Sequence, residues 1–225
     1  MALLSVKGMP IMSDMPLYRE YSVGDIRIAV WEMNETSDEL SSLLAQECLA
    51  GLPVACSEQR RRERLAVRVL LSRLCGNNAR IVYDAAGKPM LEGAAGFISI
   101  SHTRGYALLA HSPELSFGID VELLSRDASS AARRFMRADD IAALEPVVAK
   151  KAILLRWCVC EALFKLVGNV GGTYRDNVFL ETPLPLADGT LKVHLRGCGN
   201  FPDGDYVAHC IEDDGLLVVC LSAER

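Results

Sequence analysis

Apolar residues recur along this chain at helical spacing in some segments and at strand spacing in others. The clearest helical pattern covers Ser57–Leu74, where an apolar stripe and a row of arginines occupy different faces. Val147–Leu166 carries the longest pattern, and Ser37–Leu49 carries another, for which Ser37 is a candidate cap. Two shorter stretches, Ala131–Met136 and Arg137–Leu144, are also predicted to be helical.

Short alternating or β-branched runs bounded by turn residues predict strands in both halves of the chain. We expect strands at Asp25–Trp31, Arg80–Tyr83, Gly96–Ser101, Tyr106–Ala110, Phe117–Val121, Val178–Glu181, Leu191–Leu195, Asp205–Ile211 and Leu216–Leu221, with an extended lead-in before the first. Each half therefore runs from helix-rich to strand-rich. This order predicts an α+β fold of two similar α+β subdomains, residues 1–113 and 114–225, joined near residues 111–117.

The composition and net charge of the chain exclude some classes of function. The 225 residues are 50% hydrophobic and 24% charged, which is enough for a buried core without disulfides or metal staples. The net charge of −5 argues against a general nucleic-acid binder. The chain has no signal-peptide pattern and no long uncharged apolar run, so we expect a cytoplasmic protein that binds no membrane.

The eight cysteines are scattered and contain no CxxC pair, so we expect reduced, buried thiols. Cys158 and Cys160 resemble a metal pair, but both fall in a predicted helix. Residues two apart on a helix point in widely different directions and cannot share one ion.

The mid-chain motif GIDVE places two carboxylates, Asp120 and Glu122, on the same side of a predicted strand. Paired carboxylates suit Mg²⁺, which proteins hold through one or two carboxylates together with substrate phosphates. Two solvated acids at a strand end are the alternative.

A second motif lies on the longest predicted helix, where Trp157, Glu161 and Lys165 share one face at four-residue spacing. Glu161 and Lys165 by themselves suit an ordinary surface ion pair. Placed near Asp120 and Glu122, they would instead complete a site for Mg²⁺ and phosphate.

Three further features are chemically suggestive. Ser101 and His102 end a predicted strand and could offer donors to a phosphate, although a structural histidine is the alternative. Adjacent strand residues point to opposite faces, and no GxSxG motif is present, which excludes a serine hydrolase built on this pair. Lys88-Pro89 lies in a turn, and the arginine run that begins at Arg60 is either a solvated face or a counter-charge for phosphate.

In this order, GKP, ISISH, GIDVE and W-x-x-x-E-A-x-x-K resemble the 4′-phosphopantetheinyl transferase superfamily. The length and the mid-chain GIDVE are similar to the surfactin-synthetase-activating type, a monomer whose two similar halves are related by a pseudo-two-fold axis. The clear resemblance spans residues 60–165. It implies a transferase that moves phosphopantetheine from coenzyme A to a serine of an apo acyl or peptidyl carrier protein and releases adenosine 3′,5′-bisphosphate.

The resemblance also implies roles for individual residues, at a site between the two subdomains. Asp120, Glu122 and Glu161 would hold Mg²⁺, with Glu161 also a candidate base and Lys165 the group that neutralises the phosphate under attack. The coenzyme A-binding residues would be Lys165 and, from the N-terminal subdomain, Arg60, Lys88, Pro89, Ser101 and His102. The resemblance implies that Arg60 or a neighbouring arginine reaches the 3′-phosphate, and it does not specify which.

The chain departs from the family pattern at Cys160, where a lysine is usual. Because Cys160 is about 100° around the helix from Glu161, we expect it at the rim of the site. We therefore expect slower turnover or altered carrier preference, and Cys160→Lys to raise or spare the rate. This departure keeps a second reading open, a non-catalytic binder of coenzyme A or a carrier, besides a Mg²⁺-dependent phosphohydrolase.

The partner implied by the resemblance presents an acidic helix, whereas this chain is itself acidic. A local basic patch could still attract such a partner. Arg133, Arg134 and Arg137 are the candidates for it, and scattered solvated arginines are the alternative.

Overall fold

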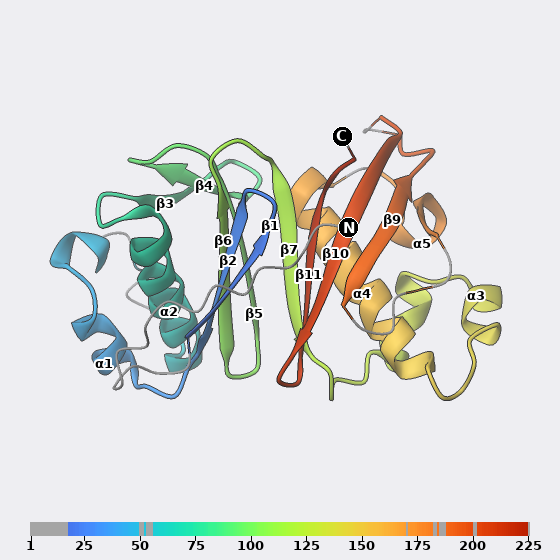
Figure 1. Ribbon diagram of the computed structural model, residues 1–225, viewed down its shortest axis with the longest axis horizontal. Coiled ribbons are helices and arrows are strands. Elements are labelled where there is room, and N and C mark those ends of the chain that lie inside the picture. The colour runs from blue at the N-terminus through green and yellow to red at the C-terminus, as the bar shows by residue number, and fades with distance from the viewer. Residues whose placement is uncertain are drawn as a thin grey trace. The chain divides into compact units, whose positions relative to one another are not determined.

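The computed structural model describes residues 18–49, 52, 56–169, 171–181, 184, 188–199 and 202–224. These residues form two compact units, one ending at Leu115 and the other beginning at Ser116. The division lies two residues after the one expected from the sequence. Both units combine antiparallel strands with helices, so the fold is α+β (Figure 1).

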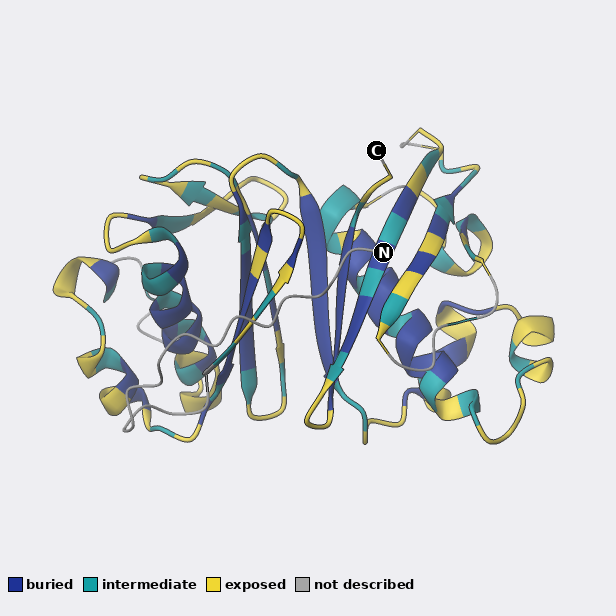
Figure 2. Ribbon diagram, in the orientation of Figure 1, coloured by how far each residue is buried: buried dark blue, intermediate teal, exposed yellow. Residues whose placement is uncertain are grey.

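The first unit contains a four-stranded antiparallel sheet and one long helix. The sheet order is β1-β2-β6-β5, and β3 and β4 form a separate hairpin. The elements are β1 (Tyr18–Val23), β2 (Ile26–Glu32), α1 (Ser37–Ser42), a 3₁₀ turn (Gln46–Leu49), α2 (Glu58–Cys75), β3 (Arg80–Tyr83), β4 (Pro89–Glu92), β5 (Phe97–Thr103) and β6 (Tyr106–Ser112). Helix α2 packs on β2 and β6 through its buried side (Figure 2).

The core of this unit forms where the apolar stripe of α2 meets one face of the sheet. Leu65 and Leu70 of α2 are fully buried together with Trp31 of β2 and Leu109 of β6. The predicted Ser57–Leu74 helix is thus confirmed, with Ser57 as its N-cap. The burial of its apolar side is the main reason this helix is stable.

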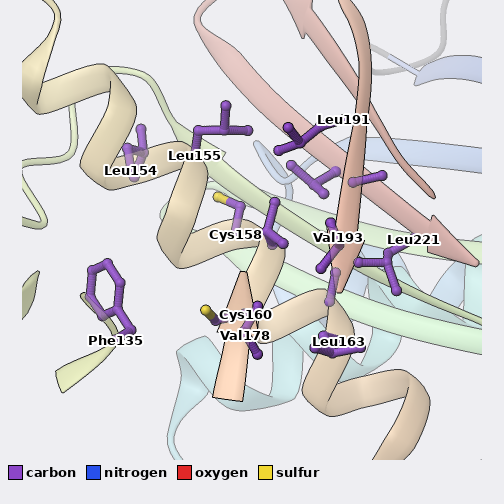
Figure 3. Close-up of a cluster of buried hydrophobic side chains, with 14 of the residues drawn as sticks. Phe135, Leu154, Leu155, Cys158, Cys160, Leu163, Val178, Leu191, Val193 and Leu221 are labelled. Atoms are coloured by element: carbon purple, nitrogen blue, oxygen red, sulfur yellow. The ribbon is translucent and has the colours of Figure 1, made fainter. Parts of the chain in front are cut away.

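The second unit contains a five-stranded antiparallel sheet in the order β7-β11-β10-β9-β8. Its elements are β7 (Phe117–Leu123), a 3₁₀ turn (Ser129–Arg134), α3 (Ala138–Ala142), α4 (Ala149–Val167), α5 (Tyr174–Asn177), β8 (Val178–Leu180), β9 (Gly189–Leu195), β10 (Gly204–Asp213) and β11 (Leu216–Ala223). Helix α4 packs on β7 and β11. Leu155, Leu163, Val193 and Leu221 lie in the resulting core (Figure 3).

One order of elements occurs in both units. In the first, β2 precedes α2, and it pairs with β6, the second strand of the β5–β6 hairpin that follows. In the second, β7 precedes α4, and it pairs with β11, the second strand of the β10–β11 hairpin. Each unit is therefore built around a strand, a helix and a hairpin connected in the same way.

Some predicted elements differ from the structure. Ser37–Leu49 is not one helix, because α1 ends at Ser42, whose hydroxyl donates to the carbonyl of Glu39 and favours a break. Its cap is Thr36 rather than Ser37, in a capping box with Glu39. The stretch predicted as helical at Ala131–Met136 is the 3₁₀ turn Ser129–Arg134.

The sequence pattern also missed three elements, one of which is strand β4, where only a turn at Lys88-Pro89 was expected. Strand β1 pairs with β2 across a turn at Gly24, whose φ is 56°, where only an extended lead-in was expected. The short helix α5 was not predicted. Among the described residues, no helix is both long and apolar enough to cross a membrane.

Candidate functional site

The acidic motif of β7 lies directly against α4 because a glycine separates the two backbones. A side chain at Gly118 would place its first carbon 2.9 Å from the backbone nitrogen of Leu166 and closer still to the carbonyl oxygen of Ala162. Only glycine allows this approach. The glycine of GIDVE thus brings α4 within reach of the two carboxylates that follow it on the strand.

Both carboxylates of β7 point to α4, as the alternation of the strand predicted. The Lys165 Nζ lies 2.7 Å from Oδ1 of Asp120, and the Trp157 Nε1–H donates to Oε1 of Glu122 at 3.2 Å. Asp120 and Glu122 are each only 5% exposed. They are therefore not the solvated strand-end acids of the alternative interpretation.

Arg126, which belongs to none of the motifs above, completes this group. Arg126 forms an ion pair with Oε1 of Glu122, and its guanidinium carbon lies 5.0 Å from the centre of the Trp157 ring. We call Asp120, Glu122, Glu161, Lys165 and Arg126 the acidic cluster. The four-residue separation of Glu122 and Arg126 was the available signal, but the turn after β7 gave no reason to expect that they meet.

Glu161 is electrostatically part of the acidic cluster. Burial raises the pKa of its carboxyl, and the Asp120 charge raises it further, while Lys165 and Arg126 act in the opposite direction. A half-buried carboxyl with a raised pKa holds a proton more readily than one in water. This property suits a group that accepts a proton during a reaction.

The three carboxylates are not gathered as the ligands of one ion. Within the described part of the chain, no group of three or more His, Cys, Asp or Glu side chains is arranged to hold a metal. Two of the three carboxylates instead form ion pairs, Asp120 with Lys165 and Glu122 with Arg126. Their oxygen atoms are nevertheless the donor type that Mg²⁺ prefers.

Cys160 lies in the core of the second unit, so the expectation that it lies at the rim is wrong. It is 5% exposed and belongs to the hydrophobic cluster that contains Cys158 (Figure 3). Burial raises the pKa of its thiol to about 12, although Arg156 lowers it. The rotation of about 100° from Glu161 carries the side chain into the core because α4 is covered on more than one side.

The buried cation beside Cys160 joins several elements. Arg156 is 7% exposed and donates to the carbonyl oxygens of Phe135, Tyr174 and Val178, the last at 2.5 Å. It thereby ties α4 to the end of the 3₁₀ turn, to α5 and to β8. The eight cysteines are all free thiols, as expected, but the expectation that they are buried is wrong for three of them: Cys56 is exposed, and Cys75 and Cys198 are partly exposed.

A second group of predicted residues lies in the first unit. Arg60 of α2 and His102 of β5, 42 positions apart, meet with 3.0 Å between Nη1 and Nε2. Arg60 also lies 3.2 Å from the buried Glu63, whose Oε2 is 3.8 Å from His102 Nε2. We call Arg60, Glu63 and His102 the arginine–histidine cluster; Glu63 was not foreseen.

The other predicted residues of this unit are placed differently. Ser101 is buried and His102 is exposed, as expected for neighbours on a strand. Lys88 and Pro89 lie on the β3–β4 hairpin, where Oδ1 of Asp84 accepts hydrogen bonds from the backbone of Ala86 and Lys88. Strand β4 of this hairpin packs beside β5, the strand that carries His102.

The three arginines proposed as a basic patch are all exposed. Arg133 and Arg134 lie on the 3₁₀ turn, and the Arg137 guanidinium stacks over Phe179 at 4.9 Å. Phe179 is itself exposed. The surface thus combines cations with an aromatic ring.

Comparison with known proteins gives no family assignment. No protein-family profile and no curated protein sequence matches this chain. The acidic cluster and the arginine–histidine cluster are therefore the basis for a function.

Proposed function

We propose that the protein is a 4′-phosphopantetheinyl transferase, which moves phosphopantetheine from coenzyme A to a serine of an acyl or peptidyl carrier protein. The observation that carries the proposal is the acidic cluster. Glu122 contacts Trp157, 35 residues further along the sequence, and Asp120 contacts Lys165, 45 residues further along, so the two motifs form one group. These are the same motifs whose order along the chain resembles the family.

The proposal includes a fold of two similar halves related by a pseudo-two-fold axis. The strand, helix and hairpin common to both units support it.

The acidic cluster has the groups that the transfer needs. Glu161 accepts the proton of the carrier serine, whose oxygen then bonds to the phosphorus that carries pantetheine. The bond from that phosphorus to the bridging oxygen breaks, and adenosine 3′,5′-bisphosphate leaves with the electron pair. Lys165 neutralises the charge that develops, which is the main requirement of phosphoryl transfer.

Mg²⁺, when bound by carboxylates of this cluster, would neutralise the pyrophosphate of coenzyme A. Lys165 and Arg126 already supply positive charge there. In the first unit, the arginine–histidine cluster offers a guanidinium and an imidazole to the 3′-phosphate, with Lys88 and Pro89 bordering the adenine. Charge-assisted bonds of this type are the stronger class of hydrogen bonds.

The carrier would be recognised through its acidic surface. The exposed cations Arg133, Arg134 and Arg137 supply the complementary charge, and the Phe179 ring supplies apolar contact. Complementary charge of this kind mainly raises the rate of encounter and so loses its effect in high salt.

The test is the intact mass of an apo carrier protein after incubation with this protein, coenzyme A and Mg²⁺. We expect the mass of one phosphopantetheine group to be added, and Glu161→Ala or a chelator to abolish the addition. Glu145→Ala removes an exposed acid of the same unit; it is the matched control and should retain activity. Absence of modification on fatty-acid, polyketide and peptide carriers would refute the proposal.

A further inference from the structure

The first unit contains a cavity of about 370 Å³ that is lined by the C-terminal half of α2, the 3₁₀ turn Gln46–Leu49 and the β3–β4 hairpin. Its apolar wall is formed by Leu71, Ala79, Ile81 and Val82. Two guanidiniums, a hydroxyl and a carboxylate also line it. A cavity of this size, mainly apolar and with a few polar groups, is typical of small-molecule sites.

Arg68 of α2 brings to this cavity a positive charge that no described carboxylate compensates. The side chain is half-buried, and among the described residues its guanidinium donates only to the carbonyl oxygen of Arg64, at 3.3 Å. Burial lowers the pKa of Arg68; Tyr83 acts in the opposite direction, and the charge of Arg64 lowers it further. Because an arginine stays protonated in a protein, the fold here holds a cation in a partly dry place, which an anion would stabilise.

Arg80 of β3 presents the second guanidinium to the same cavity. Its contacts with the carbonyl oxygens of Asn77 and Ala79 and with the Cys48 sulfur all use Nη1. These contacts fix the side chain, while its Nε–H and Nη2–H groups have no acceptor in the described part of the chain. A fixed guanidinium with two adjacent N–H groups available is suited to bind a planar oxyanion.

The lining also indicates which anion fits. Glu92 lies opposite Arg80 in the β3–β4 register, lines the same cavity and is exposed. Two guanidiniums and one carboxylate leave one positive charge in excess, which matches a singly charged anion better than a doubly charged phosphate. The apolar wall suits a hydrocarbon body, since contact with it removes apolar surface from water.

We propose that this cavity is a binding site for a small organic carboxylate that carries a short apolar body. The carboxylate pairs with Arg68 and Arg80, and the apolar body lies against Ile81 and Val82. Such a ligand contacts both α2 and the β3–β4 hairpin, so it stabilises the first unit when bound. The site shares no residue with the acidic cluster or the arginine–histidine cluster, and the inference does not depend on the proposed function.

The experiment measures octanoate binding to the full chain at pH 7 by isothermal titration calorimetry. We expect a dissociation constant below about 1 mM. Two comparison ligands separate the parts of the site: 1-octanol has a similar body without the charge, and acetate has the charge without the body. Each should bind at least about tenfold more weakly than octanoate. Inorganic phosphate should also bind at least about tenfold more weakly, because it lacks the body and is repelled by Glu92.

Four variants locate the site. Arg68→Gln should weaken octanoate binding by about tenfold or more, and Val82→Trp should abolish it by filling the cavity. Glu92→Gln removes the repelling carboxylate and should tighten binding by about two- to fivefold. Arg104→Gln removes a positive charge from an exposed position of the same unit and is the matched control, which should bind as the native chain does.

Circular dichroism and urea unfolding check that each variant is folded. If Arg68→Gln does not fold, the comparison of octanoate with 1-octanol on the native chain and the Val82→Trp variant still decide the question. The inference is overturned if octanoate does not bind, if 1-octanol or phosphate binds as tightly as octanoate, or if folded Arg68→Gln and Val82→Trp retain the native affinity. An equal loss in Arg104→Gln would also overturn it, because the effect would then come from net charge and not from this cavity.

Discussion

Cys160→Lys restores the residue that the family motif leads one to expect, and the structure predicts that it destabilises the protein. Cys160 is 5% exposed, and the Arg156 guanidinium is close enough to lower the pKa of its thiol. A lysine there would bring a second cation into the core beside a buried one. An uncompensated buried charge costs several kcal/mol even after the surroundings relax.

The charge can be separated from the size of the new side chain. Cys160→Met adds similar length without charge and should cost about 1–3 kcal/mol through overpacking. We expect Cys160→Lys to cost about 3 kcal/mol more than Cys160→Met. With a urea dependence of about 2 kcal/mol per molar, the midpoint of unfolding would differ by about 1.5 M.

The pH dependence gives a second signature. Burial and Arg156 would hold the pKa of the introduced amine below its value in the unfolded chain. The extra penalty is therefore absent above the unfolded pKa of about 10.4 and grows as the pH falls towards the folded pKa. Cys160→Lys and Cys160→Met should thus converge at high pH. Equal urea midpoints at pH 7, or a faster transferase with native stability, would refute this reasoning.

Changes at Gly118, Glu161 and Arg60 test other parts of the site. Gly118→Ala should lower the free energy of unfolding by about 1–3 kcal/mol, because the methyl group collides with the α4 backbone; unchanged urea unfolding would contradict that close approach. Glu161→Gln should abolish transfer yet raise the free energy of unfolding at pH 7. The pKa of the Glu161 carboxyl is raised in the folded state, so its ionised form destabilises the fold above the unfolded pKa of 4.5. In urea unfolding at pH 4, below that value, the variant and the native chain should be equally stable. If Glu161→Gln is instead less stable than the native chain at pH 7, the ionised Glu161 carboxylate does not destabilise the fold. Arg60→Gln should weaken coenzyme A binding about tenfold by calorimetry but spare 3′-dephospho-coenzyme A, with Arg27→Gln, an exposed arginine of the same unit outside the arginine run, as control; equal losses for both ligands would remove Arg60 from the 3′-phosphate.

The local pattern of apolar and polar residues was sufficient to predict most elements of the fold. The two long helices and the β5–β6 and β10–β11 strands lie where the spacing of apolar residues predicted them. One exception is the segment after α1, where a short-range polar contact, the hydrogen bond of the Ser42 hydroxyl, favours the end of the helix. The spacing of apolar residues cannot predict such a hydrogen bond between a side chain and the backbone.

Most members of the two clusters were predicted from the sequence, but Glu63 and Arg126 and the contacts of all members were not. The i, i+2 spacing of Asp120 and Glu122 and the i, i+4 spacing of Glu161 and Lys165 show which side chains share a face. The contact of Asp120 with Lys165, of Glu122 with Trp157 and of Glu63 with His102 each joins two different elements, and Arg126 reaches Glu122 from the turn after β7. For Cys160, the helical spacing predicted the direction of the side chain but not the residues that pack over it and bury it.

The sequence by itself therefore determined most of the elements, the α+β class and the faces on which the candidate residues lie, since these follow from backbone periods that neighbouring residues share. The tertiary structure decided which faces meet: Gly118 against α4, Arg60 against His102, and Arg126 with Trp157 around Glu122. These contacts join residues far apart in the chain or beyond a turn, and their formation depends on strand pairing and packing that no local spacing encodes.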